Sequence, residues 1–261
     1  MLFRRIVLCA LLVGALAGLL VSAVQHWQVI PIIAAAEVLE SAAVPHSAEH
    51  EEHMLASAHE GEHEHDDGAW APEDGAERHL WTAIANVTTA IGFGLILVAA
   101  MAAWEHLRGR PLASARTGLV WGAAGFACVF LVPALGLPPE IPGAAAAALE
   151  ARQSWWLLAA CCTAAGLAQL AFVPGRMRWL GLAVLALPFV VGVPHLEVGA
   201  YSGYSAEAER SMEALAGQFA IATAISNAIE WLALGSLAGW AVARWVRPAL
   251  ATPEAPATVR A

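Results

Sequence analysis

Histidine and glutamate gather in one polar segment, from about residue 46 to residue 65. Neutral imidazole and carboxylate together suit first-row divalent metals such as cobalt, nickel, zinc and copper. Their spacing would place several of the imidazoles on one face if the segment became helical. The alternative interpretation is a solvated acidic linker. The composition favours weak, multi-site metal capture, and the predicted ligands are His46, His50, His53, His59, His63 and His65.

One pattern in this segment resembles a catalytic motif. His59 to His63 reads as HExxH, the zinc-protease signature. In a segment so rich in both residue types a chance match is expected. Gly61 and the low-complexity surroundings also disfavour the stable helix that the motif requires. We therefore predict that the chain is not an enzyme.

Other ionisable side chains lie at or near predicted membrane depth. Such groups are costly in a bilayer and are functional candidates by default. They form a predicted line of ligands leading inward from the polar segment. For each, a helix-to-helix hydrogen bond or a cap is the alternative, and that alternative is favoured for Asn86 and Asn227. The predicted metal ligands outside the polar segment are Glu37, Glu40, Glu140, His195 and Glu230.

The elements that position these groups are apolar. The chain is 59% hydrophobic and 13% charged, with a mean hydropathy of +0.61, whereas soluble domains carry roughly 25% charged residues. A membrane-spanning helix needs about 20 apolar residues. Six runs fit this requirement, although the fifth is short and contains proline: 6–24 (with a continuation toward 33), 81–104, 117–135, 155–173, 179–193 and 219–242.

These runs predict an all-α, polytopic membrane bundle of about six transmembrane helices, with residues 1–261 as a single membrane domain. An outward-facing loop, 41–80, would join the first two helices. We expect that loop to be disordered without metal, because it is acidic and poor in aromatic residues. The first run is predicted to be an uncleaved anchor, since it is longer than the apolar core of a signal peptide.

Arginine placement predicts the orientation. With the N-terminus in the cytoplasm, ten arginines fall in inner segments and three in outer ones. This asymmetry requires the fifth run to cross, since otherwise Arg244 and Arg247 would lie outside. Both termini are therefore predicted to be cytoplasmic, with the histidine-rich loop on the periplasmic or extracellular side of a bacterial inner membrane.

Several function classes are excluded by composition. The chain has no lysine, so the phosphate-binding loop of an ATPase is impossible. The acidic loop argues against nucleic-acid binding, which needs a basic surface. The four cysteines lie in apolar runs and are read as small hydrophobes. No resident cofactor is predicted. Glycine pairs four residues apart, such as Gly118 and Gly122, predict close helix packing.

Particular stretches resemble the CbtA family of predicted cobalt transporter subunits. They are VIPIIAAAEVLE (29–40), WAPEDGAER (70–78), the pair Ala85 and Asn86, PALGLPPEIPG (133–143), RQSWW (152–156) and GVPH (192–195). The resemblance covers nearly the whole chain, and the GLPPExPG and RQxWW stretches are its most specific parts. It implies Co²⁺ uptake for cobalamin synthesis, together with a small, single-span, histidine-containing partner of the CbtB type.

Two alternatives stay open. The same architecture would serve a nickel or zinc permease, because imidazole and carboxylate ligands do not separate these metals. A membrane metal-binding or sensor protein that does not translocate its ion is also compatible with the sequence.

Overall fold

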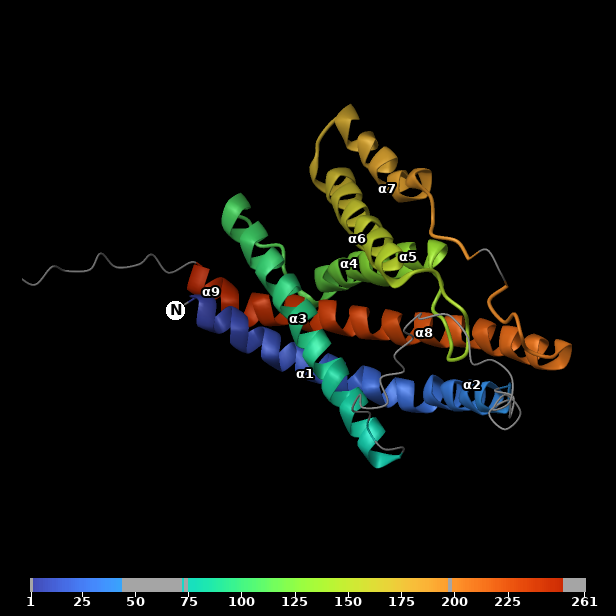
Figure 1. The fold of residues 1–261 in the computed structure, drawn as a ribbon. Coiled ribbons are helices and arrows are strands. Elements are labelled where there is room, and N and C mark those ends of the chain that lie inside the picture. Colours follow the sequence, from blue (N-terminus) through green and yellow to red (C-terminus); the bar gives the residue numbers. More distant parts are fainter. Residues whose placement is uncertain (1, 44–71, 73–74, 197–198, 251–261) are drawn as a thin grey trace, which may run out of the picture.

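The computed structural model describes residues 2–43, 72, 75–196 and 199–250, and its regular structure in these residues is all helical. The chain begins with α1 (Leu2–Gln28), which continues almost directly into α2 (Ile30–Ala43). Helix α3 (Ala76–Arg108) returns along α1 (Figure 1). The predicted helical membrane bundle is therefore confirmed, and the apolar residues of its core come from α1, α3, the 113–129 region and α8.

The third crossing is one helix with an irregular turn. Helix α4 (Ala115–Phe126) passes through the π-helical η2 (Ala127–Leu131) into α5 (Val132–Gly136). Pro133 explains the irregularity, because proline has no N–H to donate and its ring clashes with the carbonyl four residues earlier. That carbonyl, on Val129, instead accepts a hydrogen bond from the indole Nε1 of Trp156 at 3.2 Å.

The next two helices form an antiparallel pair. Helix α6 (Leu149–Phe172) is followed by the short 3₁₀ segment η3 (Arg176–Trp179) and by α7 (Leu180–Val191). The indole Nε1 of Trp155 donates to the carbonyl of Pro188 at 3.1 Å. At the other end of the pair, Gly166 lies against Gly181. In Figure 1 the pair rises away from α1 and α3.

The last helix is much longer than a bilayer requires. Helix α8 (Ala206–Ala241) continues through the π-helical η4 (Val242–Val246) into α9 (Arg247–Leu250). These 45 residues extend roughly 68 Å at 1.5 Å per residue, against a hydrocarbon core of about 30 Å. The first turns of α8 carry four charged residues (Glu207, Glu209, Arg210 and Glu213), so this part projects beyond the apolar layer.

Five of the six predicted spans are helices long and apolar enough to cross a membrane, judged over the described residues. Each of the five is longer than its predicted apolar run, because helical hydrogen bonding continues through the charged turns at its ends. The exception is the fifth run. Its helix, α7, has 12 residues, or roughly 18 Å, and Gly192 at a φ of 101° ends it soon after Pro188.

Although α7 is short, the direction of the chain shows that it makes one pass through the bundle. Helix α7 runs antiparallel to α6, and the following helix α8 ends beside the start of α1, where the Arg5 guanidinium donates to the carbonyl of Trp245 at 2.9 Å. The start of the first helix and the end of the last helix are therefore at one side of the bundle, as an even number of passes requires (Figure 1). We call the side holding Arg5 and Arg247 the Arg247 end, and the opposite side the Glu37 end.

Glycines let the helices pack closely, as their spacing predicts. A Cβ added to Gly118 would lie 2.2 Å from the carbonyl oxygen of Gly235, and one added to Gly239 would lie 2.2 Å from that of Ser114. Gly14 and Gly18 on α1 meet the backbone of α3 in the same way. Small residues at these positions bring backbones into contact. The α1–α3 and α4–α8 pairs are thereby fixed.

A smaller apolar cluster covers the Glu37 end. Its buried members are Ala36 on α2, Ile141 and Tyr201 in connecting segments, and Met212 on α8. These residues come from parts of the chain that project past the apolar spans. The cluster holds α2, the 141–144 turn and the start of α8 together, and so positions the polar residues described next.

Candidate functional site

Four of the predicted ligands outside the histidine-rich segment lie toward the Glu37 end. Glu37 and Glu40 are one turn apart on α2, Glu140 follows α5, and His195 is exposed in the segment after α7. Glu40 lies beside Gly143, whose carbonyl accepts a hydrogen bond from the Tyr204 hydroxyl at 3.2 Å. Glu37, Glu40 and Glu140 thus lie at the same end of the bundle as the apolar cluster. Within the described residues, His195 makes no hydrogen bond or ion pair with any of them.

The six histidines of the polar segment, from His46 to His65, lie outside the described residues. Their place in the chain is still informative. The described chain reaches Ala43 at the end of α2 and resumes continuously at Gly75, just before α3. Both points lie at the Glu37 end, so the histidine-rich segment is attached at the same side as these carboxylates.

Glu37 is paired with an arginine from a neighbouring helix. Arg78, in the first turn of α3, binds the Glu37 carboxylate through both terminal nitrogens, and one of these bonds measures 3.0 Å. Both side chains are more than a third exposed. The pair borders a pocket of about 170 Å³ that is also lined by Gln25, His79 and Thr82.

Glu140 is also held by an arginine. Arg152 of α6 lies 2.7 Å from its carboxylate, and both side chains are about a third exposed. The pair lines a pocket of about 510 Å³ together with the apolar side chains of Leu137, Leu149 and Leu157. Tyr201 packs against Ile141, the residue after Glu140. Burial first, then the negative charges of Glu213 and Glu140, raise the pKa of Tyr201 above its ordinary value.

This pocket joins the two stretches singled out as most specific in the sequence. Position 136, just before the prolines, favours glycine because a Cβ there would lie 2.2 Å from the ring of Trp155. Gly143 has a φ of 78°, a left-handed conformation that favours glycine. Trp155 and Trp156 then tie α6 to α7 and to η2. The motif residues therefore build the walls of the pocket and place Glu140 opposite Arg152.

Glu230 is separate from these groups. It lies well inside α8, half-buried, next to Trp231, which packs on Phe93. The nearby amide of Asn227 donates to the carbonyl of Thr223 in its own helix at 2.9 Å. Asn86 on α3 donates to Ser22 and to Gln25 on α1. Both asparagines therefore make structural hydrogen bonds, which was the favoured interpretation of their positions.

The described residues contain no group of three or more histidine, cysteine, aspartate or glutamate side chains that could hold a metal ion together. Two of the predicted carboxylates are already occupied by arginine. A divalent ion reaching Glu37 or Glu140 would therefore compete with a guanidinium, or bind the outer carboxylate face that remains open to water.

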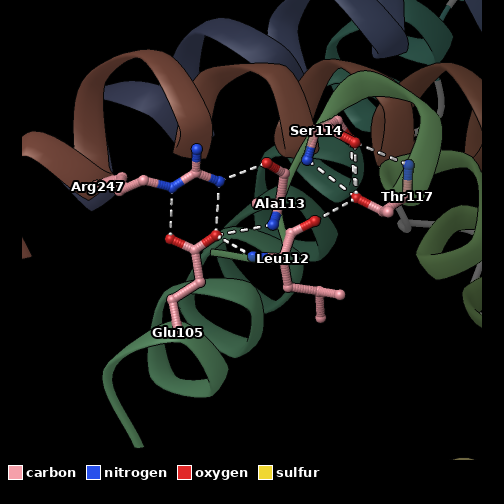
Figure 2. Close-up of polar contacts among 6 residues, drawn as sticks. All are labelled: Glu105, Leu112, Ala113, Ser114, Thr117 and Arg247. Carbon is pink, nitrogen blue, oxygen red and sulfur yellow. Dashed lines mark hydrogen bonds and ion pairs between the residues drawn. The ribbon is translucent and has the colours of Figure 1, made fainter. Parts of the chain in front are cut away.

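Sequence reasoning missed a polar centre at the Arg247 end, shown in Figure 2. The buried Glu105 near the end of α3 accepts hydrogen bonds from the backbone N–H groups of Leu112 and Ala113 at 2.8 and 2.7 Å. Arg247 binds both oxygens of the same carboxylate, at 2.9 and 2.7 Å, and also donates to the carbonyl of Ala113. Ser114 and Thr117 form a capping box directly after it.

One sequence signal could have revealed this centre. Glu105 is an acidic residue in the last turn of a helix, where the helix dipole disfavours negative charge. Such a residue needs a compensating partner, and Arg247 supplies it from 142 positions away.

A comparison with curated proteins and a comparison with solved structures each gave no match. One protein-family model does match, and it covers residues 3–243, from the start of α1 into η4. Its description is "Probable cobalt transporter subunit". With nearly the whole chain matched and the expected bundle of apolar helices present, this protein belongs to the CbtA family of probable cobalt transporter subunits.

Proposed function

We propose that the chain is the membrane-spanning subunit of a Co²⁺ importer that supplies metal for cobalamin synthesis. The observation that carries the proposal is the family match over residues 3–243. It is supported by the position of Glu37, Glu40 and Glu140 at the end to which the histidine-rich segment is attached.

In this proposal the Arg247 end faces the cytoplasm of a bacterial inner membrane. Of the described arginines, nine lie at or near that end and three (Arg78, Arg152 and Arg210) lie at the other. Cytoplasmic loops carry the excess of positive charge. The Glu37 end and the histidine-rich loop then face the periplasm, where they meet incoming metal.

The first step is capture by the loop histidines, which exchange an ion readily because many weak sites lie close together. The second step passes the ion to the carboxylates at the Glu37 end. Glu37 and Glu140 are each balanced by an arginine, so a divalent ion is bound weakly enough to leave again. His195 and, deeper in the apolar layer, Glu230 continue the pathway.

The word subunit in the family description implies a partner. A small, single-span protein with histidines of its own, of the CbtB type, is the proposed one. Its histidines would supply the ligands that complete coordination, since the described residues of this chain hold no group of three. The energy source is not an ATPase motif in this chain, which has no lysine.

The test is cobalt-57 accumulation in cells that lack their own cobalt importers and express this chain with its small partner. We expect accumulation that persists in excess nickel and zinc. A triple variant, Glu37→Gln, Glu40→Gln and His195→Ala, should lose most of it. The matched control removes two exposed carboxylates at the same end, Glu207→Gln and Glu209→Gln, and should leave uptake unchanged.

Three other results would redirect the proposal. Accumulation abolished by nickel or zinc would make the chain a permease for that metal. Metal binding by the purified protein without flux in liposomes, with the partner present, would make it a binding or sensor protein. Equal loss in the triple variant and in its control would remove the named pathway residues.

A further inference from the structure

Two histidines that the sequence analysis did not select lie against each other at the Glu37 end. His26 is in the last turn of α1, and His79 is in the first turn of α3. Their ring centres are 4.8 Å apart and their planes meet at 76°. They come from helices that glycine contacts lock together, so the pair is set by the fold rather than by a flexible loop.

This separation fits two imidazoles bound to one metal ion. A metal–nitrogen bond is about 2.0–2.1 Å, and ligands around a tetrahedral ion subtend about 109°. Two rings on one ion then have centres roughly 5 Å apart. An edge-to-face contact between two rings without metal has a similar spacing. The ring distance therefore does not by itself distinguish the two cases, and a second observation is needed.

That observation is the state of His79. Its Nδ1 atom is enclosed by protein and makes no hydrogen bond within the described part of the chain. A buried polar atom without a partner carries a free-energy cost and calls for an explanation such as an ion or a bound water. His79 also lines the pocket of about 170 Å³. At about 30 Å³ per water molecule, that volume admits several waters.

The remaining walls of the pocket supply oxygen ligands. Glu37, Gln25 and Thr82 line it with His79. The Glu37 carboxylate and the Arg78 guanidinium cancel each other's charge, and imidazole binds a metal as the neutral ring. A divalent ion therefore meets no net positive charge there.

We propose that His26 and His79 form a two-histidine binding site for a first-row divalent cation, with the remaining positions filled by water and by oxygen atoms of the adjoining pocket. The site deepens the proposed function, on which it rests for the identity of the ion, by giving Co²⁺ a first binding place in the folded helices. Imidazole pairs hold Co²⁺, Ni²⁺ and Zn²⁺ alike, so selectivity is not part of this inference.

The test measures Co²⁺ binding by the purified full-length chain through the d–d absorption of bound cobalt. The loop would contribute competing sites, so all six of its histidines are first replaced by asparagine. We expect this background to bind one Co²⁺ per chain. His26→Asn and His79→Asn should each weaken binding at least about tenfold, since even outer-sphere partners of a metal contribute that much.

The matched control is His106→Asn, which removes an exposed histidine from the opposite end of α3. It should bind as the background does. Because His26 is exposed, its replacement opens no core, and the His26 variant keeps the test decisive even if His79→Asn fails to fold. Stoichiometric binding that both variants retain would overturn the site, and so would a background that binds no cobalt.

Failure of the site is distinguishable from failure of the proposed function. Cobalt-57 accumulation that survives in the His26 and His79 variants, with their binding unchanged, overturns the site and leaves the importer in place. Binding that requires both histidines, in a protein that moves no cobalt across a membrane, supports the site and overturns the importer.

Discussion

The two ends of the bundle use carboxylates differently. At the Arg247 end, Glu105 is 6% exposed, and its two oxygens together receive four hydrogen bonds. At the Glu37 end, Glu37 and Glu140 each meet one arginine, and about a third of each side chain remains exposed. The Glu105 carboxylate is fully engaged in holding the protein together, whereas the other two keep capacity for a further ligand.

The helix contacts and the unpartnered polar atoms at the two ends differ as well. Near the Arg247 end the backbones of α4 and α8 touch through Gly118, Gly235 and Gly239. Near the Glu37 end lie two pockets, of about 170 and 510 Å³, and the unpartnered nitrogen of His79. A further pocket, of about 480 Å³, lies at the Arg247 end beside Trp104, Arg108 and Leu112. An end whose buried carboxylate has all its hydrogen bonds made resists change, and an end with spare polar capacity can admit an ion. The contrast predicts that stability depends on one end and uptake on the other.

The largest expected effect on stability is at Glu105. Glu105→Ala leaves Arg247 and two backbone N–H groups without their acceptor, so we expect the free energy of unfolding to fall by about 3 kcal/mol. This value is at the low end for a broken buried ion pair, because about a third of the Arg247 side chain is exposed. The measurement is the midpoint of thermal unfolding in detergent. Glu150→Ala, an exposed carboxylate on α6, is the control. An unchanged midpoint for Glu105→Ala would end the distinction between the two ends.

The next effect is at Gly235. In Gly235→Ala the new Cβ would lie 2.4 Å from the Gly118 carbonyl oxygen and 2.6 Å from the Gly122 backbone. Since the backbone must move to make room, we expect the free energy of unfolding to fall by about 1–3 kcal/mol. Gly217→Ala in the same helix meets nothing within 4 Å and should be neutral or stabilising, since alanine favours helix. Equal midpoints for the two variants would contradict the close α4–α8 packing.

A smaller effect on stability is expected at Glu37. Both partners of its ion pair are over a third exposed, and such pairs contribute about 0–1 kcal/mol. Glu37→Gln should therefore shift the unfolding midpoint little while cobalt-57 uptake falls severalfold. Uptake and unfolding are measured on the same membranes. A large drop in the midpoint with normal uptake would make Glu37 structural, as Glu105 is.

The smallest effect is expected for the Glu140–Arg152 pair. A double-mutant cycle with Glu140→Gln and Arg152→Gln should give a coupling free energy of about 0.2–1 kcal/mol in unfolding, as for other partly exposed pairs. The cycle subtracts any effect of either change alone. A coupling above about 2 kcal/mol would show that this pair acts as a structural clamp, and would remove the difference between the ends.

Much of the fold follows from the sequence. Apolar runs of sufficient length become spanning helices because the bilayer leaves each backbone no other way to satisfy its hydrogen bonds. The glycine pairs mark the close contacts, since only small residues let helix backbones meet. The side of Arg5, Arg108 and Arg247 follows from the alternation of passes. The same alternation predicts that α7 makes a pass, although its 12 residues are fewer than a regular membrane-spanning helix contains.

Only the tertiary structure decided which charges meet. Residues such as Glu37 and Arg78, or Glu105 and Arg247, are distant in sequence, and no periodicity links them. The same holds for His26 and His79, each of which is a lone histidine in its own stretch. Composition and spacing act locally, through helix formation and the bilayer. Ion pairs and ligand geometry depend on how helices are brought together, and that is set by packing along the whole chain.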